Sequence, residues 1–270
     1  MITPSFAVKR VLDDLNISSH KDLQLLDLIA LERGALVQYG LLDGAEARLA
    51  VGNRKAVITI SHTVTHPRRK RFSIAHELGH WEMHRWESIL ALCTKMDINE
   101  GRARSAKSSK EQQANQFASE LLLPGQFFEP LCKEKDPSLD LVTELSDVFD
   151  VSLTATAIRY MNFCDEPCAV VFSQGGFIKW FQGSQEFEEL GVFIGVRSRL
   201  DPSSLAALLF QGHVLDPNPR PRRVKASRWF ASGQCRSDAT IQEQSWFMPN
   251  YDAVLSLLWV DDDIDDDDWW

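Results

Sequence analysis

Residues 72–84 read FSIAHELGHWEMH, and this stretch limits what the chain can fold into more than any other. Three histidines recur in it at a spacing of four, and on an α-helix residues four apart stack on one face. We therefore predict a helix over residues 73–90, directly after a strand at 56–64. The three imidazoles are then candidate metal ligands, a polar stripe on a surface helix, or a coincidence.

The centre of this helix carries the pattern HELGH at residues 76–80. His76 and His80 present two imidazoles to one point, and Glu77 lies about 100° round the helix, close enough to reach water held there. Neutral imidazole binds Zn²⁺ well, zinc lowers the pKa of its water towards about 7, and a carboxylate can then take the proton. The pattern predicts a zinc site with Glu77 as general base. A chance match is the alternative, and the apolar strand and helix entry before the motif argue against it.

The third histidine of the stretch, His84, does not fit the same metal. It follows His76 by eight residues, which is about 12 Å along the helix axis, whereas zinc bonds are near 2 Å. The longer pattern HExxHxxGxxH also fails, because Met83 replaces its glycine and Trp86 its last histidine. We expect His84 to lie beside the site or at the surface.

A second predicted helix, residues 110–123, is the best source of a third ligand. Glu111 lies about 50° from the centre of its apolar face, whereas Glu120 lies about 130° away and should face solvent. We therefore predict Glu111 as the ligand. The alternative is an acidic residue favoured at a helix start by the macrodipole. The apolar face is formed by Ala114, Phe117, Ala118, Leu121 and Leu122.

The two helices together, RFSIAHELGHWEMH and EQQANQFASELLLP, resemble the ImmA/IrrE family of metallopeptidases. The resemblance is good over about residues 1–130 and loose beyond 160. It implies a small α/β unit with a zinc cleft, His76, His80 and Glu111 as zinc ligands, and Glu77 as general base. It also implies that the substrate is a helix-turn-helix repressor of phage, mobile-element or stress-response genes, whose cleavage relieves repression.

Other segments near the motif have two possible uses each. His62, His66 and Asn115 are candidate contacts to the substrate or the transition state, although a loop histidine is more often simply solvated. The basic cluster HPRRKRF at 66–72 could attract an acidic substrate segment or be a solvated loop. The strand at 56–64 could be an edge strand that pairs with extended substrate, or an ordinary sheet strand.

Composition narrows the class of protein. The 270 residues carry a formal net charge of −9, which disfavours non-specific DNA binding. The five scattered cysteines form no disulfide framework, and no apolar run is long enough to span a membrane, so we expect a cytoplasmic protein. Residues 138–160 resemble a helix-turn-helix, but the second helix has almost no basic or amide side chain. We expect packing or partner binding there rather than direct nucleic-acid binding.

The predicted fold is α+β, with a small zincin-like metallopeptidase unit and a β-rich C-terminal domain. The predicted segments are a metallopeptidase domain at 1–130, a helix-turn-helix-like segment at 131–165, a β-rich domain at 166–260 and an acidic tail at 261–270. The predicted function is that of a zinc endopeptidase acting on a protein, by resemblance a repressor. The alternative is a zinc-stabilised regulator that binds such a partner without cleaving it. The oligomeric state stays open.

Overall fold

The computed structural model describes residues 2–85, 91–93, 106–231, 236 and 238–260. The chain divides into two compact units, one formed by residues up to Phe128 with Ser146–Ser152, the other by Glu129–Leu145 with the chain from Leu153 onward. This division lies close to the predicted boundary at 130. The predicted segment 131–165 is not a separate unit, because its residues are shared between the two. The predicted tail at 261–270 lies outside the described residues.

The first unit contains a mixed four-stranded sheet of order β1-β3-β2-β4. β3 pairs in parallel with β1 and antiparallel with β2, and β2 also pairs antiparallel with β4. Because both sides of β3 are paired, this strand cannot pair with a substrate, and the edge role considered for segment 56–64 is wrong. The strands are β1 (Ala35–Gly40), β2 (Ala47–Val51), β3 (Ala56–Ser61) and β4 (Ala91–Cys93).

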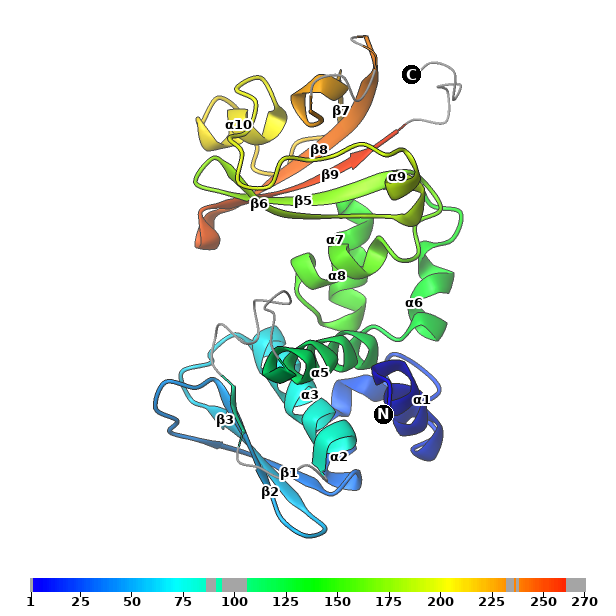
Figure 1. Ribbon diagram of the computed structural model, residues 1–270, viewed down its shortest axis with the longest axis vertical. Coiled ribbons are helices and arrows are strands. Elements are labelled where there is room, and N and C mark those ends of the chain that lie inside the picture. The colour runs from blue at the N-terminus through cyan, green and yellow to red at the C-terminus, as the bar shows by residue number, and fades with distance from the viewer. Residues whose placement is uncertain (1, 86–90, 94–105, 232–235, 237, 261–270) are drawn as a thin grey trace. The chain divides into compact units, whose positions relative to one another are not determined.

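Helix α3 lies between this sheet and helix α5, as Figure 1 shows. It is buried without interruption from Ser73 to Glu82, as expected for a helix covered on both sides. α1 and α2 also pack against α3. The helices of this unit are α1 (Pro4–Asp14), α2 (Leu26–Glu32), α3 (Pro67–His84) and α5 (Ala106–Leu122), with a 3₁₀ turn at Asp22–Leu25. Every helix in the described part of the chain is too short or too polar to cross a membrane.

α3 begins earlier than the sequence pattern predicted. Pro67 is its first residue and His66 is the N-cap, with the extended backbone typical of that position. Proline is favoured at a first helical position, because its fixed φ suits the helix and its missing N–H would have no helical partner there. The basic cluster at 66–72, expected to be a loop, is therefore the first turns of the helix.

The second unit is built on an antiparallel five-stranded sheet of order β6-β5-β9-β8-β7, which confirms the predicted β-rich part. Residues 191–196 form no strand beyond an isolated bridge between Ile194 and Phe230. The strands are β5 (Cys168–Gln174), β6 (Phe177–Gly183), β7 (Arg222–Lys225), β8 (Thr240–Met248) and β9 (Ala253–Trp259).

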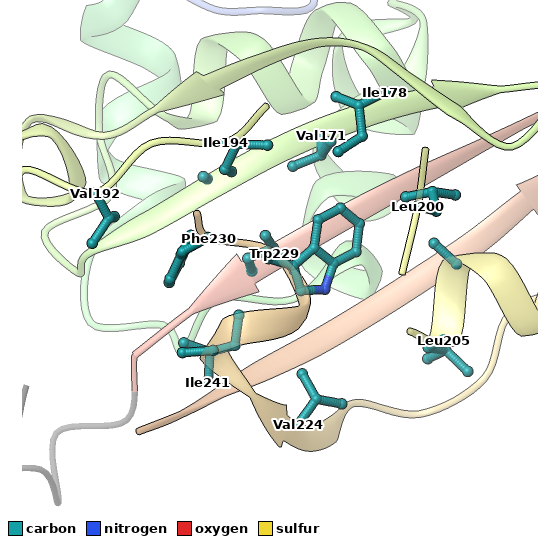
Figure 2. Close-up of a cluster of buried hydrophobic side chains, with 14 of the residues drawn as sticks. Val171, Ile178, Val192, Ile194, Leu200, Leu205, Val224, Trp229, Phe230 and Ile241 are labelled. Carbon is teal, nitrogen blue, oxygen red and sulfur yellow. The ribbon is translucent and has the colours of Figure 1, made fainter. Parts of the chain in front are cut away.

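One face of this second sheet covers a hydrophobic core. Figure 2 shows Trp229 at its centre, with Val171 and Ile178 from the sheet and Leu205 from α10 around it. On the opposite face, the backbone N–H of Leu139 donates to Gln244 Oε1 at 2.7 Å and so ties α7 to β8. The helices are α6 (Gly125–Cys132), α7 (Leu139–Phe149), α8 (Leu153–Tyr160), α9 (Gln185–Glu189) and α10 (Leu205–Phe210), with 3₁₀ turns at Ala226–Arg228 and Pro249–Tyr251.

Candidate metal centre

Four ionisable side chains are buried close together in the middle of α3, where apolar packing alone would favour hydrophobic residues. His76 and Glu77 are 0% exposed, His80 is 5% exposed and Glu82 is 2% exposed. Burying a charged or polar group costs free energy unless a partner compensates it, so such a cluster points to a functional site. The partners of these side chains therefore decide what the helix does.

Glu111 on α5 meets both motif histidines. Its Oε2 lies 3.2 Å from Nε2 of His76, and its Oε1 lies 3.4 Å from Nε2 of His80. Ligand atoms of the three side chains all lie within 4.8 Å of one another. Two atoms bound tetrahedrally to zinc at about 2.0–2.1 Å are roughly 3.3 Å apart. Two imidazoles and one carboxylate at this spacing form a group that could hold a metal ion, and the donor set suits zinc.

The far side of each imidazole is also bonded. Nδ1 of His76 lies 2.9 Å from Oδ1 of Asn115, and Nδ1 of His80 lies 3.1 Å from Nδ1 of His84. Both rings therefore turn Nε2 toward Glu111. Asn115, one of the candidate substrate contacts, bonds His76 on the side away from Glu111. His84 lies outside the ligand cluster and beside His80, in agreement with the helix geometry.

The charge state of Glu111 suits a ligand. Burial acts to raise the pKa of this carboxyl, but hydrogen bonds and charge interactions with His76 and His80 outweigh it, and the pKa lies well below its usual range. Glu111 is therefore a carboxylate across the physiological pH range. Only an ionised carboxylate offers oxygen lone pairs to a metal without losing a proton first.

Two predicted substrate contacts lie at the surface of the first unit. His62 and His66 are both exposed. His66 precedes His76 by ten residues, which corresponds to about 15 Å along the axis of α3. A contact of either histidine with substrate stays a prediction.

The basic cluster is used for structural contacts within the first unit. Arg68 donates to Ser146 Oγ at 2.7 Å and forms ion pairs with Asp147 and Asp150. Arg69 pairs with buried Glu46 at 2.8 Å. Both interpretations of this cluster, attraction of substrate and a solvated loop, are therefore replaced by a third. These contacts attach the first turns of α3 to the last turn of α7 and to the turn that follows it.

One residue of the network has no signal in the sequence. Gln113 Oε1 lies 2.9 Å from Nε2 of His84. Gln113 follows Glu111 by two positions, which places it about 200° round the helix, on what an isolated helix would count as the opposite side. The close packing of α5 on α3 brings it to the site, and only knowledge of that packing could have selected it.

Comparison with known proteins relates part of the chain to a known family. Residues 32–161 match the model of the family Peptidase_M78, described as the IrrE N-terminal-like domain. This match over residues 32–161 confirms the resemblance seen in the two helix motifs.

A solved structure of a Mycobacterium tuberculosis transcriptional regulator has a similar fold, with a TM-score of 0.56. Its sequence identity is 15%, and the match covers 95% of this chain and 76% of the other. A likeness at this identity concerns the fold alone. No curated protein sequence matches the chain.

Proposed function

We propose that this protein is a zinc-dependent endopeptidase that hydrolyses a peptide bond in a protein substrate. The observation that carries the proposal is the convergence of His76, His80 and Glu111, with buried Glu77 on the same helix between the two histidines. A site that only stabilises a fold needs three or four ligands and has no use for a carboxylate in that position. The match to a peptidase family over residues 32–161 supports the same reaction.

The chain's own residues divide the reaction between them. His76, His80 and Glu111 would hold the metal, which when bound supplies Lewis acidity to the scissile carbonyl and to the attacking water. Glu77 would take a proton from that water as its oxygen adds to the carbonyl carbon. The same carboxyl would then give the proton to the amine nitrogen as the C–N bond breaks. Water is consumed, and a new carboxyl and a new amine terminus result.

The substrate proposed from the family resemblance is a helix-turn-helix repressor, and its cleavage would relieve repression in the cytoplasm. The structural neighbour is itself named a transcriptional regulator, which supports a role near transcription. Direct binding of nucleic acid by this chain is not proposed. Ser146, Asp147 and Asp150 around the turn between α7 and α8 are bonded to Arg68.

The experiment measures cleavage of a small repressor encoded beside the gene of this protein. The natural chain and the Glu77→Gln variant are assayed side by side. We expect cleavage by the natural protein with zinc, loss of cleavage with a chelator, and loss of at least about 100-fold in rate for Glu77→Gln at equal zinc content. Equal cleavage by the variant would refute the mechanism. Tight repressor binding by both proteins without cleavage would establish the competing function, a zinc-stabilised regulator that binds without cutting.

A further inference from the structure

A histidine that binds a metal through one ring nitrogen carries its hydrogen on the other, and that N–H needs an acceptor. Nε2 of His80 lies 3.4 Å from Oε1 of Glu111, so this nitrogen faces the ligand cluster. When His80 binds a metal through Nε2, the hydrogen of its neutral ring sits on Nδ1. The atom 3.1 Å from that Nδ1 is Nδ1 of His84.

Two Nδ1 atoms can share a hydrogen bond only if one carries the hydrogen and the other does not. Nε2 of His84 lies 2.9 Å from Oε1 of Gln113, and an amide oxygen accepts but never donates. Neutral His84 therefore carries its hydrogen on Nε2 and donates it to Gln113. Its Nδ1 is then an acceptor, as the N–H of His80 requires.

The other motif histidine shows the same arrangement by a shorter route. Nδ1 of His76 lies 2.9 Å from the amide oxygen Oδ1 of Asn115. At His76 an amide oxygen of α5 receives the ring N–H directly. At His80 the ring N–H is accepted by His84 instead. The amide oxygen of Gln113 on α5 bonds the other side of the His84 ring.

We propose that Gln113 and His84 form a hydrogen-bond relay that holds His80 in the tautomer with hydrogen on Nδ1 and so directs its Nε2 to the metal. Gln113 sets the direction of the relay, and His84 transmits it. His84 is a positioning residue and not a ligand. The inference rests on metal binding by His76, His80 and Glu111, and does not depend on the proposed peptidase activity.

The test uses two substitutions of nearly equal size in the full chain. In His84→Asn, the side-chain oxygen can take the place of Nδ1 and still accept from His80, whereas His84→Leu removes the acceptor. We expect zinc affinity, measured by competition with a chromophoric chelator, to fall about 10- to 100-fold in His84→Leu. His84→Asn should stay within about threefold of the natural chain.

A spectroscopic measurement separates positioning from packing. In the zinc-loaded protein, a ¹⁵N–¹H correlation spectrum detects the Nδ1–H of His80 only where a hydrogen bond protects it from exchange with solvent. We expect this signal in the natural chain and in His84→Asn, and its loss through fast exchange in His84→Leu. Gln113→Met on α5 provides a second variant if His84→Leu does not fold, and it should lower zinc affinity in the same direction.

Three outcomes would overturn the relay. They are zinc affinity of His84→Leu equal to that of the natural chain, equal weakening in His84→Asn and His84→Leu, and a His80 Nδ1–H signal that no substitution changes. These measurements use no substrate. The test of the relay is therefore valid even if the protein has no peptidase activity. A natural chain that binds no zinc would remove the relay together with the metal centre.

Discussion

Phe117 of α5 packs directly on Gly79 of α3. A Cβ atom placed at Gly79 would lie 2.9 Å from Cδ1 of Phe117 and 3.1 Å from its Cβ. Real side chains do not approach so closely without a shift of one of them. The glycine of HELGH therefore lets the two helices come close enough for Glu111 to reach both His76 and His80.

Gly79→Ala should lower stability and zinc affinity together. Helix propensity alone would make this substitution stabilising by up to about 1 kcal/mol, because alanine restricts the unfolded chain more than glycine does. Overpacking against Phe117 should reverse the sign and destabilise by about 1–3 kcal/mol. Urea unfolding and a zinc titration measure the two effects.

Phe117→Leu offers the matching control, since the smaller side chain leaves room for the new methyl group. The double variant should recover part of the zinc affinity that Gly79→Ala loses, so the two substitutions should not be additive. If the Gly79→Ala protein is more stable than the natural chain, the Phe117 side chain can move aside at little cost in free energy.

Glu111→Gln should lose zinc, whereas Glu120→Gln on the same helix should keep it. Glu111 contacts both histidines, and Glu120 instead accepts hydrogen bonds from Ser5 and Gln116. Zinc at 100 times its dissociation constant should stabilise the natural chain by about 2.7 kcal/mol, and a chelator should reverse this. Equal stabilisation of Glu111→Gln would move the third ligand elsewhere. Metal content by mass spectrometry and thermal unfolding provide the readouts.

Glu82 should contribute strongly to stability from the side of α3 away from metal chemistry. Its carboxylate is buried and accepts two hydrogen bonds from Arg33, at 2.8 and 2.9 Å, and another from Arg10. Glu82→Gln should destabilise by about 3–5 kcal/mol, because two guanidinium groups lose their buried counter-charge. Asp14→Asn removes the exposed partner of the same Arg33 and should cost less than about 1 kcal/mol. The free energy of unfolding of both variants is measured by urea unfolding. Similar losses in Glu82→Gln and Asp14→Asn would contradict the prediction.

Glu243 should make the stability of the second unit depend on pH. Burial raises the pKa of this carboxyl, and the N–H of Ala206 at 2.9 Å offsets the rise only in part. Its contribution to stability is therefore complete below the unfolded pKa near 4.3 and is lost as pH rises through the folded pKa. Between the two values, the free energy of unfolding should fall by up to about 1.4 kcal/mol per pH unit.

The measurement is urea unfolding, followed by tryptophan fluorescence, between about pH 4.5 and 8. Glu243→Gln should remove this part of the pH dependence, so the natural chain should lose stability relative to the variant as pH rises. Glu188→Gln, at an exposed position, should leave the profile of the natural chain unchanged. A difference between natural chain and Glu243→Gln that stays constant with pH would contradict the prediction.

Local sequence patterns were enough to predict the elements whose own residues show a clear periodicity. The strand β3, the helices α3 and α5 and the α+β class follow from alternation and helical spacing, and the structure confirms the class. β8 was not predicted, because its apolar pattern is interrupted by the polar residues Gln242, Glu243, Gln244 and Ser245. These polar residues are tolerated in a strand because tertiary partners satisfy them, such as Leu139 for Gln244 and Ala206 for Glu243.

The sequence by itself determined the family and the three side chains predicted to hold a metal, because helix periodicity assigns His76, His80 and Glu111 to definite faces of two helices. Only the tertiary structure decided which groups surround them. The packing of α3 on α5 brings Gln113 to His84 and Asn115 to His76. The apparent basic loop is the start of a helix, and its arginines form ion pairs with Asp147 and Glu46. Contacts between elements depend on how closely and at what angle the helices cross, and no spacing within a single element encodes that.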